Sequence, residues 1–235
     1  MIHYEFDWQI ILSGKYFDWL VSGLKTTLQL SAISILLAFS LGLIIALMRM
    51  TQFRPVRWFA YAYLEFFRNT PLLIQLFFWY FASYKLLPQI INDYLATTNF
   101  EFTAAVIALT VYTSAFIAED VRSGVRSIPK EQMEAARSFG FSYVRAMRYV
   151  ILPQATRIII YPLITQFLNL TKNSSLAMTI GVAELTYQAR QVESYTFKGY
   201  EAFTAATILY LAMSLVISLV VSLYGKAVRI PTKGP

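Results

Sequence analysis

The residue types that catalyse reactions or bind metals are scarce and scattered in this chain of 235 residues. One histidine and no cysteine exclude thiolate sites and leave too few ligands for a histidine-based metal centre. Glu65, Glu119, Asp120 and Glu184 are candidate acids, but no His/Cys cluster or paired carboxylate motif accompanies them. A phosphate-binding loop of the form G-x-x-x-x-G-K-[ST] is also missing. The sequence therefore predicts no catalytic or metal site, and no ATP hydrolysis by that route.

Polar residues within apolar stretches are the candidates for handling a solute. One group surrounds a proline, which removes a backbone hydrogen bond and so exposes the peptide groups of residues 68–73. Interrupted helices beside the substrate recur in transporters, so this group could meet the charged ends of an amino acid. The structural alternative is that Glu65 and Arg68, three residues apart on a helix, simply pair. The group comprises Arg68, Thr70, Pro71 and Gln75.

A second polar group ends a later apolar stretch, and its first four members share one helical face. A polar stripe facing lipid is costly, so it is expected to line a pore or a partner helix. Lys172 could attract a carboxylate, and neutral Asn173 adds no fixed anion, which predicts a preference for acidic or neutral polar amino acids over arginine or lysine. Helix–helix packing through Asn and Ser is the alternative. The group comprises Thr165, Asn169, Lys172, Asn173, Ser174 and Ser175.

The elements that carry these residues are expected to be membrane-spanning helices in one domain, 1–235. Only 14% of the residues are charged, against about 25% in soluble domains, so lipid is the expected solvent. The sequence predicts an all-α membrane protein with about five transmembrane helices. An aromatic, partly charged segment, 1–19, is expected at the membrane interface, and its acidic start predicts no cleavable signal peptide. The predicted spans are roughly 26–48, 58–84, 102–118, 150–170 and 202–224.

The distribution of Lys and Arg predicts the orientation. Most of these 20 residues fall on the side of the spans that also carries the connector 120–149. By the positive-inside rule that side is cytoplasmic, which places the N-terminus outside and the C-terminus inside. Because topology explains the excess of basic residues, binding of nucleic acid is not expected.

The connector 120–149 is more patterned than a solvated loop requires. Ile128-Pro129 interrupts the chain, and the residues from Lys130 to Phe139 strongly favour a helix. Gly140 is expected to end that helix through a positive φ angle, and a second short helix is expected from Tyr143. The alternative is a pair of interfacial helices that only link two spans.

The connector resembles the EAA signature of the permease subunits of ABC importers. Further segments are similar to the histidine/glutamine/glutamate permease family, with the glutamate/aspartate-type branch the most similar. Asn69 stands where that family usually has Gly, and Asn173 where Asp is common. The signature comprises Glu134-Ala135-Ala136, Gly140, Val150 and Leu152-Pro153; the further segments are 67–73, 118–125, 152–155 and 172–176.

The resemblance implies a type I importer permease fold in the bacterial cytoplasmic (inner) membrane, with a cytoplasmic coupling helix that docks on a separate ATPase. ATP would bind to that ATPase, in two copies, and this chain would carry no cofactor. The other implied partners are an extracytoplasmic solute-binding protein and a polar amino acid, glutamate/aspartate or glutamine-like. Five helices give too few walls for a closed path, so a second permease subunit, identical or homologous, is expected. The predicted coupling residues are Glu131, Glu134, Ala135, Ala136 and Gly140.

Two other classes of function remain open at this point. A subunit of an ion-coupled secondary amino acid transporter would need internal repeats or an ionic relay through the membrane, and no convincing repeat is visible. A membrane enzyme would need a catalytic motif beside its candidate acids. Uptake that survives loss of the ATPase would favour the secondary transporter.

Overall fold

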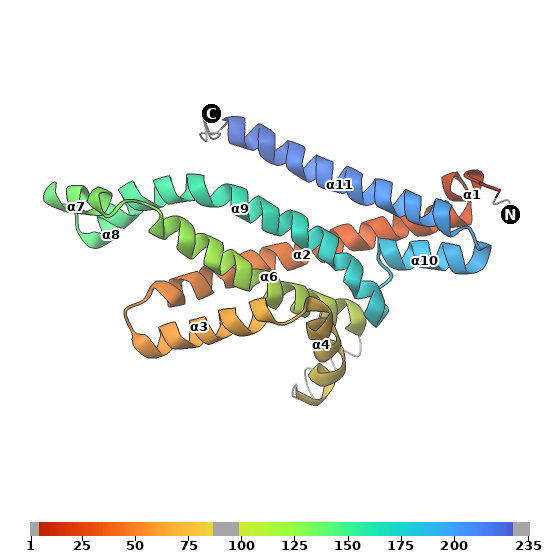
Figure 1. Cartoon of the computed structure of the whole chain (residues 1–235), viewed down its shortest axis with the longest axis horizontal. Helices are drawn as coiled ribbons and strands as arrows, with labels where there is room; N and C mark the ends of the chain where they lie inside the picture. The colour runs from red at the N-terminus through yellow and green to blue at the C-terminus, as the bar shows by residue number, and fades with distance from the viewer. Residues whose placement is uncertain (1–4, 87–98, 228–235) are drawn as a thin grey trace. The chain divides into compact units, whose positions relative to one another are not determined.

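The computed structural model describes residues 5–86 and 99–227 of the chain, with side chains at 5–82 and 99–220. All the secondary structure in this part is helical, as predicted (Figure 1). His3, Arg229 and Lys233 lie outside it. The elements are α1 (Gln9–Leu12), α2 (Lys15–Met50), α3 (Arg54–Asn69), α4 (Leu72–Leu86), α6 (Phe100–Arg126), α7 (Lys130–Ser138), α8 (Tyr143–Ala146), a π turn η1 (Met147–Ile151), α9 (Leu152–Asn173), a 3₁₀ turn η2 (Ser174–Ile180), α10 (Leu185–Thr196) and α11 (Gly199–Ala227).

Among the described helices, three are long and apolar enough to cross a membrane: α2, α6 and α11 over Gly199–Val220. They correspond to the first, third and fifth predicted spans. The second predicted span, 58–84, is not one helix, because α3 ends at Asn69 and α4 begins after Pro71. The fourth corresponds to α9, which keeps Pro162 inside it. The total of five spans therefore stays a prediction.

Two helices extend further than the sequence patterns indicate. α2 begins at Lys15, so the end of the predicted interfacial segment belongs to the first long helix. α6 continues to Arg126, so the connector begins after that residue rather than at Asp120. Glu119 and Arg122 form an ion pair one turn apart on α6, with Nε of the arginine 2.9 Å from the carboxylate. Such a pair supports a helix through charged residues.

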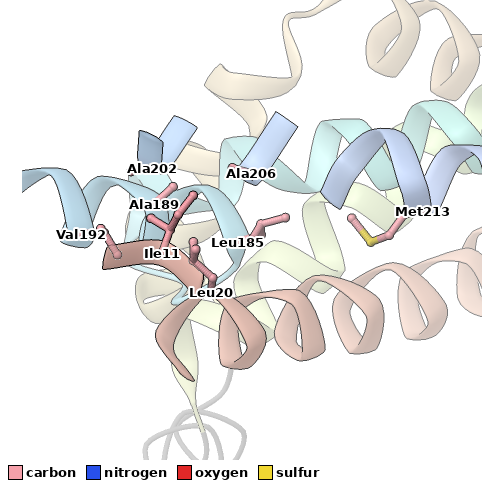
Figure 2. Packing of buried hydrophobic residues seen from close by; sticks show 8 residues of the cluster. All are labelled: Ile11, Leu20, Leu185, Ala189, Val192, Ala202, Ala206 and Met213. Carbon is pink, nitrogen blue, oxygen red and sulfur yellow. The ribbon is translucent and has the colours of Figure 1, made fainter. Parts of the chain in front are cut away.

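The chain divides into two compact units, which we describe separately: the first unit is Met1–Leu36, Thr70–Thr110 and Leu168–Ile217, and the second unit is Leu37–Asn69, Val111–Phe167 and Ser218–Pro235. The first unit has an apolar core drawn from α1, α2, α10 and α11 (Figure 2). Small side chains in α10 and α11 let these helices approach closely. The buried cluster comprises Ile11, Leu20, Leu185, Ala189, Val192, Ala202, Ala206 and Met213.

A buried carboxylate fastens the start of α10 in the first unit. The Glu184 side chain is fully buried and accepts hydrogen bonds from the backbone N–H groups of Thr186 (3.0 Å) and Tyr187 (2.8 Å). The Tyr210 hydroxyl of α11 donates a third bond to it at 2.6 Å. Burial raises the pKa of the Glu184 carboxyl, because its charged form loses contact with water.

Helices of the second unit pack through glycines. A Cβ atom on Gly42 of α2 would lie 2.7 Å from Cγ2 of Ile117, and one on Gly124 of α6 would lie 2.1 Å from Cγ1 of Ile159. Neither space admits a side chain without movement. Small residues at such contacts are typical of helices in membranes. In α3, the Tyr63 hydroxyl lies 2.7 Å from Oγ of Ser114 on α6.

Candidate functional site

The connector forms the short helix that the sequence predicts. α7 runs from Lys130 to Ser138, and Gly140 follows it with a φ of 82°. The N–H of Gly140 bonds to the carbonyl of Arg137 (2.9 Å), and that of Phe141 to the carbonyl of Ala136 (3.2 Å). These bonds satisfy the last carbonyls of the helix, which only a residue in the left-handed region allows at this position. The predicted role of Gly140 in ending the helix is confirmed.

Two short elements of different type, the helix α8 and a π turn, then lead into α9. Ser142 caps α8 by accepting a hydrogen bond from the N–H of Arg145 at 3.4 Å. A π turn, Met147–Ile151, joins α8 to α9. α7, α8 and the π turn all contact one another, and the buried side chains of Ala136, Ala146 and Ile151 contribute to this part of the unit. The connector is therefore a packed assembly rather than a loose loop.

The exposed surface of this assembly differs in part from the predicted coupling surface. Glu131, Glu134 and Ala135 are exposed on one face of α7, because they are three or four residues apart. Ala136, predicted to allow close approach of a partner, is 6% exposed and packs inside the connector instead. The helical rotation between neighbouring residues turns its methyl group away from the exposed face.

Large apolar side chains on the connector were missed by the motif-based reasoning. Phe139 is 85% exposed at the end of α7, and Val144 is 72% exposed on α8. Exposed apolar groups clustered on a short segment are typical of protein–protein contacts. The available signal was a phenylalanine directly before the glycine that ends an otherwise polar helix.

The polar residues of the first predicted substrate-path group divide between the two units. In the first unit, α4 begins after Pro71, and Nε2 of Gln75 donates to Oγ1 (2.7 Å) and to the carbonyl (3.2 Å) of Thr70. In the second unit, Arg68 is exposed, and its guanidinium carbon lies 5.5 Å from the ring centre of Phe116. The interruption predicted at Pro71 is confirmed.

The alternative pairing of Glu65 with Arg68 is wrong in this structure. The Glu65 carboxylate accepts from Nδ2 of Asn69 at 2.9 Å instead. The amide lies four residues on and also bonds to the Glu65 carbonyl at 2.8 Å, which holds it in place at the end of α3.

The second predicted group lies at the end of α9 and in the 3₁₀ turn after it. Thr165 and Lys172 are exposed, and Asn169 and Asn173 are half-buried. On the adjacent face, Leu170 is fully buried. The described chain therefore leaves the polar stripe open, either to water or to another subunit.

The two serines of this group use their hydroxyls locally. Ser174 is buried and donates to the carbonyl of Thr171 at 2.8 Å, while Ser175 donates to that of Lys172 at 2.7 Å. Their 3₁₀ turn contacts α4 within the first unit. The structure thus brings α4, which begins after Pro71, together with the 3₁₀ turn after Asn173. Irregular backbone at membrane depth is tolerated only where protein or a watery cavity surrounds it.

No group of three or more His, Cys, Asp or Glu residues that could hold a metal occurs in the part of the chain that the structure describes. The described part of the chain combines three helices long and apolar enough to cross a membrane with a short connector helix that ends before Gly140, the pattern of a multi-pass membrane protein. Over residues 38–230 the chain matches the family described as the binding-protein-dependent transport system inner membrane component, and it belongs to that family.

Similar proteins are known from bacteria. The chain is 44% identical to a probable glutamine ABC transporter permease protein of Bacillus subtilis (strain 168), over 86% of this chain and 90% of the relative. It is 33% identical to a glutamate/aspartate import permease protein of Escherichia coli (strain K12), over 97% and 96% of the two chains. A crystal structure described as an amino acid ABC transporter with histidines aligns with a TM-score of 0.84 at 34% identity, covering 95% of this chain and all of that one.

These matches confirm the predicted family and fold. The chain is a multi-pass permease subunit of the inner membrane and not an enzyme, and ATP hydrolysis belongs to a separate subunit. The secondary transporter considered as an alternative is not favoured.

Proposed function

We propose that this chain is the transmembrane subunit of an ABC importer for acidic or neutral polar amino acids, and that α7 docks on its ATPase. The observation that carries the docking surface is the capped connector helix, which exposes Glu131, Glu134 and Ala135 on one face and Phe139 at its end. The carboxylates offer ion pairs, and the phenyl ring offers apolar area for a pocket.

The proposed mechanism follows from how the connector is built. Two ATPase copies bind and hydrolyse ATP, and their closure displaces α7 on each permease subunit. Because α7, α8 and the π turn pack together, the displacement reaches α9. α9 carries the polar stripe that includes Asn169 and Lys172, so its movement changes access to the path between two permease subunits. An extracytoplasmic solute-binding protein delivers the amino acid from the opposite side.

The proposed topology places the connector and the C-terminus in the cytoplasm and the N-terminus outside. Arg126, Lys130, Arg137, Arg145 and Arg148 all lie at or in the connector, which supports this orientation by the positive-inside rule.

The proposed substrate class rests on the charge of the polar stripe. Lys172 is an exposed cation beside the neutral Asn173, so the stripe favours a carboxylate and adds no anion for a second ammonium group. The glutamine and glutamate/aspartate permeases among the relatives support the same class. Purified transporter without the binding protein is expected to bind glutamate or glutamine more tightly than arginine. Tighter binding of arginine would contradict this substrate class.

The docking surface is tested by co-purification of the ATPase with the permease. Glu134→Ala removes an exposed carboxylate from α7 and is expected to weaken the complex at least about fivefold, the effect of losing about 1 kcal/mol at an interface. Glu193→Ala, which removes a carboxylate from α10, is the matched control and should bind the ATPase normally. Equal retention of the ATPase by the two variants would contradict the role of Glu134.

A further inference from the structure

The joint between the connector and α9 has an unusual backbone pattern. In the π turn Met147–Ile151, the N–H of Leu152 bonds to the carbonyl of Met147, five residues before it. Pro153 follows and has no N–H, so a regular α pattern would leave the carbonyl of Tyr149 without its donor. π turns within helices are rare and occur frequently at functional sites.

The side chain of Gln154 contacts both the π turn and α7. Nε2 of Gln154 donates to the carbonyl of Val150, within the π turn, at 2.8 Å. The same nitrogen lies 3.4 Å from Oε1 of Gln132, which is on α7. A primary amide carries two N–H groups, so Gln154 can make both bonds at once. It therefore connects the proposed docking helix to the first turn of α9.

The packing among α7, α8 and the π turn relies, in α7 and α8, on small buried side chains. The buried residues of α7 and α8 are the alanines Ala136 and Ala146, whose methyl groups contact their neighbours without a preferred direction. Hydrogen bonds, in contrast, require a particular distance and angle. The amide of Gln154 supplies that directional restraint where the connector joins α9, so that a displacement of α7 is passed to α9.

We propose that Gln154, together with Gln132, is a positioning pair that transmits the movement of α7 to α9, so that ATP hydrolysis is coupled to transport. This inference rests on the proposed docking of an ATPase at α7. It goes beyond that docking because it assigns the transmission step to Gln132 and Gln154, which are not among the proposed docking contacts Glu131, Glu134 and Ala135.

The experiment uses the permease assembled with its ATPase and binding protein in proteoliposomes. Two quantities are measured: the amount of ATPase that co-purifies, and the number of amino acid molecules imported per ATP hydrolysed. Gln154→Leu removes both hydrogen bonds while keeping a side chain of similar size. It is expected to keep the ATPase bound and to lower import per ATP about fivefold, the factor for losing the one hydrogen bond of about 1 kcal/mol that joins α9 to α7.

Variants at Gln132 separate transmission from a local role of Gln154 at the π turn. Gln132→Leu removes the acceptor on α7 and leaves the bond to Val150 intact, so it should lower import per ATP as Gln154→Leu does. Gln132→Glu keeps an acceptor oxygen and should restore the normal ratio. Because Gln132 is exposed, neither substitution at this position disturbs a buried core.

A covalent bridge provides an independent rescue. The chain has no cysteine, so Gln132→Cys with Gln154→Cys gives the only thiols on this subunit. A short bifunctional thiol reagent should restore import per ATP in the double variant, and it should leave each single variant uncoupled.

The outcomes distinguish this inference from the docking proposal. If ATPase binds normally to the wild-type chain but Gln154→Leu and Gln132→Leu both import at the normal ratio, the positioning pair is refuted and the docking proposal stands. If the wild-type chain retains no ATPase, the docking proposal fails and this inference fails with it. If Gln154→Leu does not fold, the Gln132 variants and the cross-linked pair decide the matter.

Discussion

At the scale of single residues, Glu184 is a carboxylate buried outside the membrane-spanning helices. It accepts three hydrogen bonds, two from the first turn of α10 and one from Tyr210 of α11. Its neighbour Leu185 donates its backbone N–H to Oγ1 of Thr27 on α2 at 3.1 Å. This cluster fixes α10 against α2 and α11, the helices whose apolar residues form the core in Figure 2.

The raised pKa of Glu184 predicts how stability depends on pH. Because the folded state holds the proton more tightly than the unfolded state, protonation contributes stability at low pH. This contribution is lost as the pH rises from the ordinary pKa of a glutamic acid through the raised pKa. Each unit of the shift corresponds to about 1.4 kcal/mol.

The measurement is the unfolding temperature of the detergent-purified chain between acidic and neutral pH. Glu184→Gln removes the ionisable group while keeping an acceptor oxygen, so the variant should show a smaller decline with rising pH than the wild type. Glu5→Gln, at an exposed carboxylate, should leave the decline unchanged. A decline that is equally steep in Glu184→Gln would show that this carboxyl does not titrate as described.

At the scale of elements, the glycine that follows α7 has a matched counterpart between α1 and α2. Gly140 and Gly14 both have positive φ angles, 82° and 75°, and a Cβ atom at either position would meet nothing within 4 Å. Alanine at either site would therefore act through backbone strain alone, which costs roughly 1–2 kcal/mol.

Gly140→Ala and Gly14→Ala are expected to lower the stability of the chain by similar amounts. Only Gly140→Ala should also reduce co-purification of the ATPase, because it changes how α7 ends and where Phe139 lies. Thermal unfolding and pull-down of the ATPase measure the two effects separately. If both variants lose the ATPase to the same extent, the loss results from general instability and not from a change in the connector.

How much could be predicted from the sequence differs between elements. α7 and its end were predictable, because helix propensity and the need for glycine at a positive φ are local properties. The break at Pro71 was predictable for the same reason. The extension of α6 to Arg126 was not, because the apolar run that predicts the span ends at Ala118 and the helix continues through charged residues. The π turn was also missed, since the 3.6-residue periodicity does not report a single i→i+5 turn.

In the candidate site, too, local features were predictable from the sequence and features that depend on packing were not. Sequence motifs identified the connector, yet they could not indicate that Ala136 faces inward while Phe139 faces outward, because that depends on how α7 packs against the π turn. Likewise, the sequence allowed Glu65 to pair with Arg68, but the side-chain amide of Asn69 donates the hydrogen bond to the Glu65 carboxylate. Competition between neighbouring partners is decided by side-chain geometry and not by spacing alone.

At the scale of the whole molecule, the chain leaves large apolar surfaces uncovered. α11 is one of the described helices that could span a membrane, and only 11% of its most apolar 18-residue stretch is buried. Lipid and further subunits must cover this helix, because such a surface is not stable in water. The open polar stripe on α9 also requires water or another subunit beside it. Both features agree with a permease that works as part of a larger assembly.

The central claim is that the connector lies in the cytoplasm, where an ATPase can reach it. The absence of cysteine from the sequence allows single thiols to be placed at will. Ser138→Cys puts one at the exposed end of α7, and Ser194→Cys puts one at an exposed position of α10, on the side predicted to be external. Intact cells are treated with a membrane-impermeant maleimide and compared with permeabilised cells.

In intact cells, the cysteine at position 194 should be labelled and the one at position 138 should not. Permeabilisation should expose position 138, and bound ATPase should then slow its labelling. Labelling of position 138 from outside intact cells would place the connector on the wrong face of the membrane and contradict the account.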